Sequence, residues 1–161
     1  AGACELRTPA FLEKRGVFVT LHRNRELRGC IGSLAPVEPL GEGVRSNAVN
    51  AAFNDYRFAP LTAAELPEVH IEVSVLTEPQ PLTYTDADDL TRQLRPGIDG
   101  VILQGPGNEQ ATFLPQVWQQ LPQPELFLDH LCRKAGLSGD AWRSGRLRVF
   151  TYQVQSFEEP R

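Results

Sequence analysis

Residues 27–33 read Leu27-Arg28-Gly29-Cys30-Ile31-Gly32-Ser33, and the surrounding sequence is organised around this stretch. Before it lies GVFVTLH (16–22), and a polar turn, RNRE (23–26), separates the two. Because β-branched and aromatic residues suit a pleated, half-buried surface, the two stretches predict a β-hairpin. Glycine weakens an ordinary strand, so the two glycines predict a bulge or a close approach of another backbone.

The side chains of a strand alternate between two faces, which divides this stretch into two sets. Leu27 and Ile31 share one face with Gly29, and we expect that face to contact the core. The opposite face carries Arg28, Cys30 and Gly32. That second face borders either a cleft or a second layer of core, and the alternation does not choose between them.

Length and composition predict an ordinary globular protein with a single domain over residues 1–161. The chain has 161 residues, of which 41% are hydrophobic and 22% charged, and its net charge is -4. A mildly acidic chain is not a general nucleic-acid or membrane-surface binder. Basic residues are nevertheless frequent near one end, where they form either a solvated face or a local patch: Arg7, Lys14, Arg15, Arg23, Arg25 and Arg28.

Three widely spaced cysteines, Cys4, Cys30 and Cys132, do not make a disulfide framework. Neither the cysteines nor the histidines show metal-ligand spacing, so we predict no metal site and no cofactor. The sequence has no apolar run of about 18 residues and no basic-plus-apolar leader. These features predict a reducing, cytoplasmic setting. Methionine is absent even at position 1, so we expect the segment 1–15 to be truncated relative to the natural protein.

The remaining patterns predict a mixture of helices and strands without regular βαβ alternation. Helices are expected at 39–56, 63–66, 86–94, 115–121 and 124–135, and strands at 69–76, 100–104, 110–114 and 147–157. The order favours an α+β fold with a mainly antiparallel sheet flanked by helices. The turn between residues 104 and 110, which contains GPGN (105–108), lacks the Gly-Lys-Ser/Thr ending of a phosphate loop.

Cys30 has two interpretations. In the first it is a reactive thiol, whose pKa is lowered by Arg28 and by neighbouring backbone amides. In the second it is a small hydrophobic residue, since free cysteine is among the most buried residue types. A nucleophilic cysteine also needs a base, and His22 and His70 are the candidates.

Two further groups of polar residues accompany Cys30. His70, Glu72 and Ser74 lie on one face of the strand at 69–76, where they line the same cleft or simply face solvent. In the first case Glu72 is a proton acceptor or the counter-ion of Arg28. Asp55 and Arg57 form either a charged pair in the site or a turn held by local hydrogen bonds.

Several stretches in order resemble the AMMECR domain family: GVFVTL (16–21), LRGCIG (27–32), DYRFAPL (55–61), ELP (65–67), IEVSVLTEP (71–79), PGIDGVIL (96–103), ATFLPQVW (111–118) and FLDHLCRKAGL (127–137). LRGCIG is the hallmark of that family, and the resemblance begins at about Gly16. The resemblance implies a larger and a smaller lobe with a cleft near the LRGCIG strand. It also implies a Memo-like protein and a radical-SAM protein as partners, but no established reaction.

The leading functional hypothesis is an enzyme, or an enzyme subunit, of an uncharacterised modification pathway. Its candidate catalytic residues are Cys30 as nucleophile or redox thiol, Arg28 as anion binder and Glu72 as proton carrier. The candidate substrate-binding residues are Gly29, Gly32, Asp55, Arg57, Ser74 and His70. Two alternatives stay open: an adaptor module that binds a radical-SAM or Memo-like partner, and an RNA-binding protein. The substrate itself, a small molecule or a macromolecule, is not specified by the sequence.

Overall fold

The computed structural model describes residues 12–160, which form two compact units. Unit 1 comprises residues 12–78 and 155–160, and unit 2 comprises residues 79–154. Unit 2 is therefore a continuous insertion into the chain of unit 1. Cys4 and most of the predicted N-terminal segment lie outside the described residues. The single domain, the unequal lobes and the cleft expected from the sequence stay predictions.

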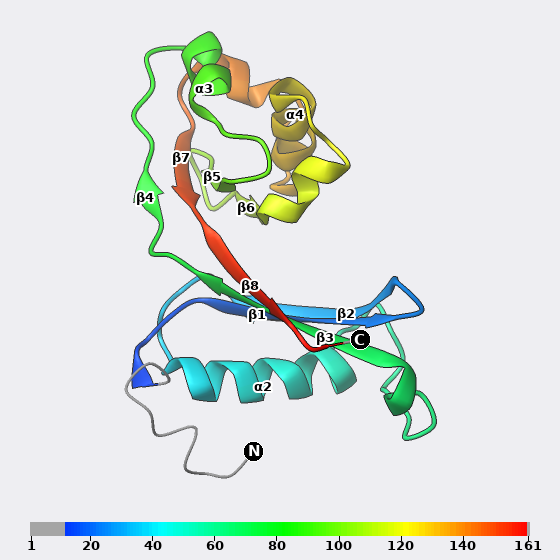
Figure 1. Cartoon of the computed structure of the whole chain (residues 1–161). Helices are drawn as coiled ribbons and strands as arrows, with labels where there is room; N and C mark the ends of the chain where they lie inside the picture. Colours follow the sequence, from blue (N-terminus) through cyan, green and yellow to red (C-terminus); the bar gives the residue numbers. More distant parts are fainter. Residues whose placement is uncertain (1–11, 161) are drawn as a thin grey trace. The chain divides into compact units, whose positions relative to one another are not determined.

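Unit 1 is built on a four-stranded sheet in the order β2-β1-β3-β8 (Figure 1). Its strands are β1 (Val17–Arg23), β2 (Glu26–Ser33), β3 (Val69–Leu76) and β8 (Val154–Glu158). Both β2 and β3 pair antiparallel with β1. Helix α2 (Leu40–Phe53) runs along one face of this sheet, and the short 3-10 helix η2 (Leu66–Glu68) precedes β3 (Figure 1).

The predicted hairpin is present, and its turn needs no glycine. Asn24 and Arg25 adopt φ values of 54° and 66°, the left-handed pair that a two-residue turn requires between twisted antiparallel strands. Asparagine tolerates this region better than most residues, so a turn without Asn-Gly still closes the hairpin.

The core of unit 1 lies between the sheet and α2. Val19, Leu21 and Ala51 are buried there, with partly buried apolar residues from α2, β2 and β3 around them. Because β1 alternates, its other residues face away from α2. The opposite face of the sheet consequently carries the polar side chains of β1 and β3.

Unit 2 has its own four-stranded sheet, in the order β4-β7-β5-β6. Its strands are β4 (Gln80–Pro81), β5 (Gly100–Gln104), β6 (Gln110–Phe113) and β7 (Arg148–Tyr152). The helices of this unit are α3 (Ala87–Gln93), η3 (Pro115–Gln119), α4 (Pro124–Lys134) and η4 (Ala141–Ser144). Asp86 caps α3, because its carboxylate accepts a hydrogen bond from the Asp89 amide.

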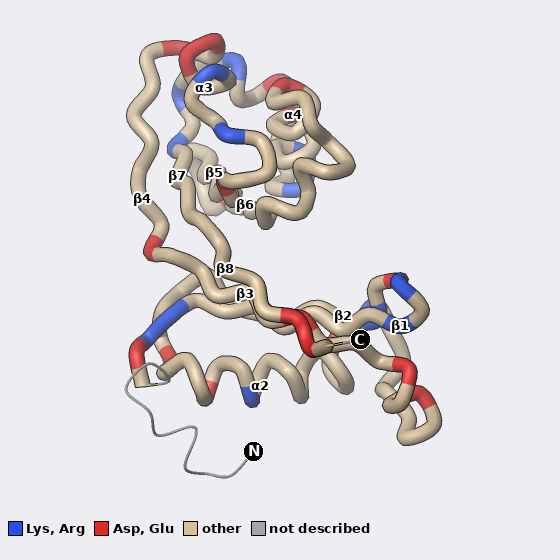
Figure 2. The backbone as a smooth tube through the Cα atoms, viewed as in Figure 1, with Lys and Arg blue, Asp and Glu red and all other residues tan. Residues whose placement is uncertain are grey.

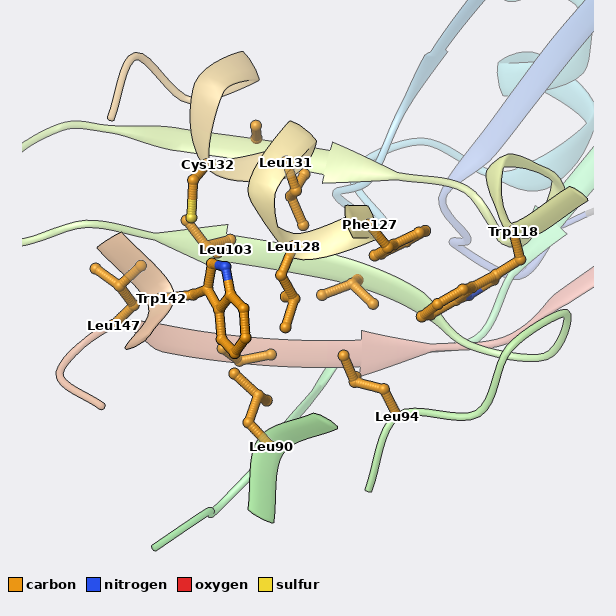
Figure 3. Close-up of a cluster of buried hydrophobic side chains, with 13 residues drawn as sticks. Leu90, Leu94, Leu103, Trp118, Phe127, Leu128, Leu131, Cys132, Trp142 and Leu147 are labelled. Carbon is orange, nitrogen blue, oxygen red and sulfur yellow. The ribbon is translucent and has the colours of Figure 1, made fainter. Parts of the chain in front are cut away.

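A cluster of large apolar side chains holds unit 2 together (Figure 3). Phe127, Leu128 and Leu131 of α4 pack with residues of β5 and with Trp142 of η4. Cys132 belongs to this cluster, and its burial raises the pKa of its thiol. Cys132 is therefore a structural core residue.

The α+β class and the antiparallel pairing are confirmed, and two element predictions are wrong. The strand predicted at 147–157 is two strands, β7 and β8, which belong to different sheets and are separated at Gln153. The helix predicted at 63–66 is absent, because that segment holds turns and only the start of η2. The short helix predicted at 115–121 is present as the 3-10 helix η3. In the described part of the chain, no helix has the length and apolarity needed to cross a membrane.

Candidate functional site

The sheet face opposite α2 gathers polar residues from three strands into cross-strand rows. Thr20 of β1 lies opposite Cys30 on one side and opposite Glu72 on the other. His22 lies opposite His70 in the same way, and Phe18 opposite Ser74. Residues directly opposite each other point to the same face, so Cys30, Thr20 and Glu72 form one continuous row.

The geometry of the hairpin brings the Cys30 thiol against the Thr20 hydroxyl, with Sγ and Oγ1 3.3 Å apart. The N–H and C=O of Cys30 point away from β1, because both bond to groups outside the sheet. Opposed residues of that kind form the closer type of antiparallel pair, in which side chains approach each other. His22 is the diagonal neighbour of Cys30 on this face, within the reach of a long side chain.

Asp55 and Arg57 hold the backbone of Cys30 from outside the sheet. The Cys30 amide donates to Asp55 Oδ2 at 3.0 Å, and Arg57 Nη2 donates to the Cys30 carbonyl at 3.3 Å. The two side chains also bond each other, with Arg57 Nη2 2.7 Å from Asp55 Oδ2. Because β2 is an edge strand, this pair occupies hydrogen-bonding positions that another strand would otherwise take.

The opposite charges of Asp55 and Arg57 stabilise each other. The hydrogen bond from Arg57 holds the pKa of Asp55 well below its usual range, and the Cys30 amide adds to the effect. Asp55 is only 3% exposed, so its carboxylate depends on these partners. The pKa of Arg57 is raised, chiefly by its hydrogen bond to Asp55.

Arg28 lies at a β-bulge and contacts a different segment. Leu21 pairs with Gly29 while His22 pairs with Leu27, so Arg28 has no partner of its own on β1. Its Nε donates to Glu65 at 3.0 Å and its Nη2 donates to the Ala59 carbonyl at 2.7 Å. The bond from Arg28 lowers the pKa of Glu65 to about 2. The carboxylate in contact with Arg28 is thus that of Glu65, whereas the sequence suggested Glu72.

The bulge also corrects the expected face of Leu27. Since Leu27 lies opposite His22, its side chain is on the Cys30 face of the sheet and not on the face of Gly29 and Ile31. It is 43% exposed, in keeping with that position. Simple alternation fails here because one extra residue in the strand reverses the faces beyond it.

Comparisons with known proteins agree with this architecture. The family model AMMECR1 matches residues 3–157 of the chain. The chain belongs to the AMMECR1 family. A protein of Thermofilum pendens is 43% identical, over 94% of this chain and 76% of its own. A protein of Methanothermobacter thermautotrophicus is 40% identical, over 98% of this chain and 85% of its own.

A solved structure of similar fold gives the same result. The crystal structure of an uncharacterized protein from Pyrococcus horikoshii matches with a TM-score of 0.86 and 36% sequence identity. The match covers 94% of this chain and 77% of that one. The AMMECR1 family and its fold are therefore established for this chain, and its chemistry is a separate question.

The two glycines of the LRGCIG stretch are explained by packing. A Cβ on Gly29 would lie 2.2 Å from the Ala51 carbonyl oxygen of α2, so this glycine permits the close approach predicted from the sequence. A Cβ on Gly32 would lie 2.4 Å from the Phe18 ring, whose side chain covers the glycine across the strands. Their assignment to substrate binding stays a prediction.

Two contributors to the site were missed in the sequence. Thr20 had no signal beyond its place in an alternating strand, and its contact with Cys30 depends on the hairpin register. Glu65 was not among the predicted site residues, yet it accepts hydrogen bonds from both Arg23 and Arg28. Figure 2 shows acidic residues beside the basic ones at this end of the hairpin, which reduces the suggested basic patch.

His70 lies opposite His22 on the polar face, on the side of β1 away from β2. Its ring nitrogens lie 3.6 Å from a Glu158 oxygen and 3.8 Å from a Glu159 oxygen, next to β8. Among residues 12–160, no group of three or more His, Cys, Asp or Glu side chains is arranged to hold a metal ion.

Proposed function

We propose that the protein is an enzyme, or the thiol-bearing subunit of one, in which Cys30 acts as a nucleophile on a small electrophilic substrate. The observation that carries this proposal is the row Cys30–Thr20–Glu72 across three strands, with Sγ 3.3 Å from the Thr20 hydroxyl. A hydroxyl both donates and accepts, so Thr20 can take the thiol proton while it passes its own proton to the Glu72 carboxylate.

Arg57 supports the thiolate in this proposal. Its guanidinium bonds to the Cys30 carbonyl and is fixed by the buried Asp55 carboxylate. A fixed cation near a thiol lowers the free energy of the thiolate relative to the thiol. Arg28 remains proposed for the anionic part of a substrate, although its guanidinium already bonds Glu65 and the Ala59 carbonyl.

The proposal is tested by the rate of Cys30 alkylation with iodoacetamide at pH 7, in a Cys4→Ser/Cys132→Ser background. Arg57→Ala should slow the reaction at pH 7 by about fivefold or more, because the thiolate loses its cation. Arg57→Lys should restore much of the rate, and Glu72→Gln should lower it.

Arg45→Ala is the matched control, since Arg45 is an exposed cation of α2. It should leave the rate unchanged. Equal rates for Arg57→Ala and the parent protein would contradict a nucleophilic Cys30.

The resemblance adds partners to the proposal, a Memo-like protein and a radical-SAM protein, and keeps the adaptor alternative. An adaptor needs the LRGCIG surface but no thiol chemistry. Co-purification with such a partner that survives Cys30→Ala but is lost in Arg28→Ala would favour the adaptor over the enzyme.

A further inference from the structure

A polar cavity in unit 2 lies far along the chain from Cys30 and uses different residues. It has a volume of about 530 Å³ and is lined by the turn between β5 and β6, by Gln104 and Gln110, and by Arg146 and Arg148. A volume of this size is in the usual range for small-molecule sites, roughly 300–1,000 Å³. Its charged and amide lining favours a strongly polar ligand over an apolar one.

The strand register explains why these side chains share one place. Gln104 lies opposite Gln110 on one side and opposite Arg148 on the other. The neighbouring row, Leu103, Ala111 and Val149, belongs to the hydrophobic cluster, so the Gln104 row faces away from that core. Arg146 is two residues before Arg148, beside the buried Leu147, and also lines the cavity.

The turn that closes the cavity is fixed by its own hydrogen bonds. Gly105 donates its amide to the Glu109 carbonyl at 2.9 Å, and Gly107 donates its amide to Glu109 Oε2 at 2.8 Å. The Glu109 carboxylate is thus bonded within the turn, although it also lines the cavity. Within residues 12–160, neither Arg146 nor Arg148 forms an ion pair.

We propose that this cavity binds the phosphate group of a small polar molecule through Arg146 and Arg148. Two cations line the cavity against one carboxylate, that of Glu109, and this excess of positive charge raises the local concentration of anions. A phosphate monoester carries a charge of about -1.5 to -2 and three acceptor oxygens, which matches two guanidinium groups. A single carboxylate would occupy one guanidinium fork and leave the other unpaired. Figure 2 shows the basic chain segment at the start of β7.

This phosphate site differs from a phosphate loop, whose backbone amides at a helix N-terminus hold the anion. Here the GPGN turn joins two strands, and the positive charge comes from the side chains of Arg148, at the start of β7, and Arg146, just before it. The absence of Gly-Lys-Ser/Thr from the turn therefore does not argue against binding. The glutamine amides supply further hydrogen bonds for the rest of the ligand.

The test is a titration of the ¹⁵N-labelled full chain with inorganic phosphate and, separately, with adenosine monophosphate, followed by amide resonances. We expect both probes to shift the amides of residues 104–110. Arg146→Ala/Arg148→Ala should weaken binding of both by about tenfold or more, equivalent to about 1.4 kcal/mol. Both arginines are exposed, so this variant should keep the thermal midpoint of the parent.

Arg92→Ala/Arg133→Ala is the matched control, because it also removes two exposed cations of unit 2 that do not line the cavity. It should bind both probes like the parent. Equal weakening in the two double variants, or undiminished binding in Arg146→Ala/Arg148→Ala, would overturn the proposal.

A single-stranded RNA of 12 nucleotides distinguishes a nucleic-acid backbone from a small phosphate. If it binds more than about twelvefold more tightly than adenosine monophosphate, with a steep salt dependence, the cavity belongs to a polyanion surface and the proposal fails. A 12-nucleotide RNA offers about twelve equivalent phosphates, so RNA binding up to about twelvefold tighter than that of adenosine monophosphate supports a small-molecule phosphate.

Discussion

The segment after α2 forms the hydrogen bonds to the Cys30 backbone that a neighbouring strand would otherwise form. Asp55 accepts from the Cys30 amide and Arg57 donates to its carbonyl, so one residue is held on both sides. The two interpretations of this pair, a local turn and a part of the site, are compatible. A local hydrogen bond from the Arg57 amide to Asp55 makes the turn, and the side chains reach across to β2.

Asp55→Asn should lower the free energy of unfolding by about 2 kcal/mol at pH 7, because charged hydrogen bonds to a buried carboxylate are lost. The folded-state pKa of Asp55 lies below the unfolded value of about 3.9, so its contribution is fully present above that pH. This contribution to the free energy of unfolding is lost progressively as the pH falls from the unfolded pKa towards the lower folded-state pKa. Urea unfolding at pH 7 and pH 3 should therefore show a smaller difference at pH 3.

Glu26→Gln is the control for this experiment, because Glu26 is an exposed carboxylate of β2, the strand that Asp55 contacts, and forms no ion pair within residues 12–160. We expect it to change stability little at either pH. A difference between Asp55→Asn and the parent that is the same at both pH values would contradict the role given to the Asp55 charge.

The hairpin and α2 pack closely because glycines, which have no side chain, lie at two of their contacts. Gly29 faces the Ala51 carbonyl, and Gly43 of α2 lies against Val17 of β1, where a Cβ would be 2.8 Å from the Val17 side chain. Close packing of a helix on a sheet requires small residues at the contact. The glycines of the LRGCIG stretch are thus needed for the element that carries Cys30, whatever the chemistry of Cys30.

Gly29→Ala should destabilise the protein by about 3 kcal/mol, because a methyl group at 2.2 Å from a backbone carbonyl forces strand and helix apart. The thermal midpoint, measured by circular dichroism, would show this loss. Gly139→Ala is the control: the atoms near its new Cβ belong to the end of the Arg133 side chain, which can move. A Gly29→Ala protein as stable as Gly139→Ala would show that α2 does not need this approach.

Across the whole chain, each unit has its own sheet and its own buried cluster. The chain leaves the first sheet after β3 and returns to it as β8, the neighbour of β3 in that sheet. Stability is then carried by two cores that respond separately to local damage.

Leu128→Ala, a fully buried change in unit 2, should cost about 3 kcal/mol. Native-state hydrogen exchange should report most of that loss in residues 79–154, and less in residues 12–78. Leu21→Ala, in the core of unit 1, should show the opposite distribution. Equal losses of protection in both ranges for both variants would mean that the two units open together.

The sequence determined the elements whose signal is local. Alternation in β3, the helix at 86–94 and the glycine-cysteine strand could all be read from neighbouring residues, and so could the α+β class. The family resemblance followed from the same stretches. The residue pattern also pointed to Cys30, Glu72, Asp55 and Arg57 as residues of interest, although it did not give their contacts.

Tertiary contacts decided the features that depend on pairing between residues distant in the sequence. Residues 147–157 are divided into β7 and β8 because each half pairs in a different sheet. The alternation of residues along this segment gives no sign of that division. The bulge at Arg28 reversed the face of Leu27 and directed Arg28 to Glu65. The row of Cys30, Thr20 and Glu72 exists because strand register joins residues that are far apart in sequence.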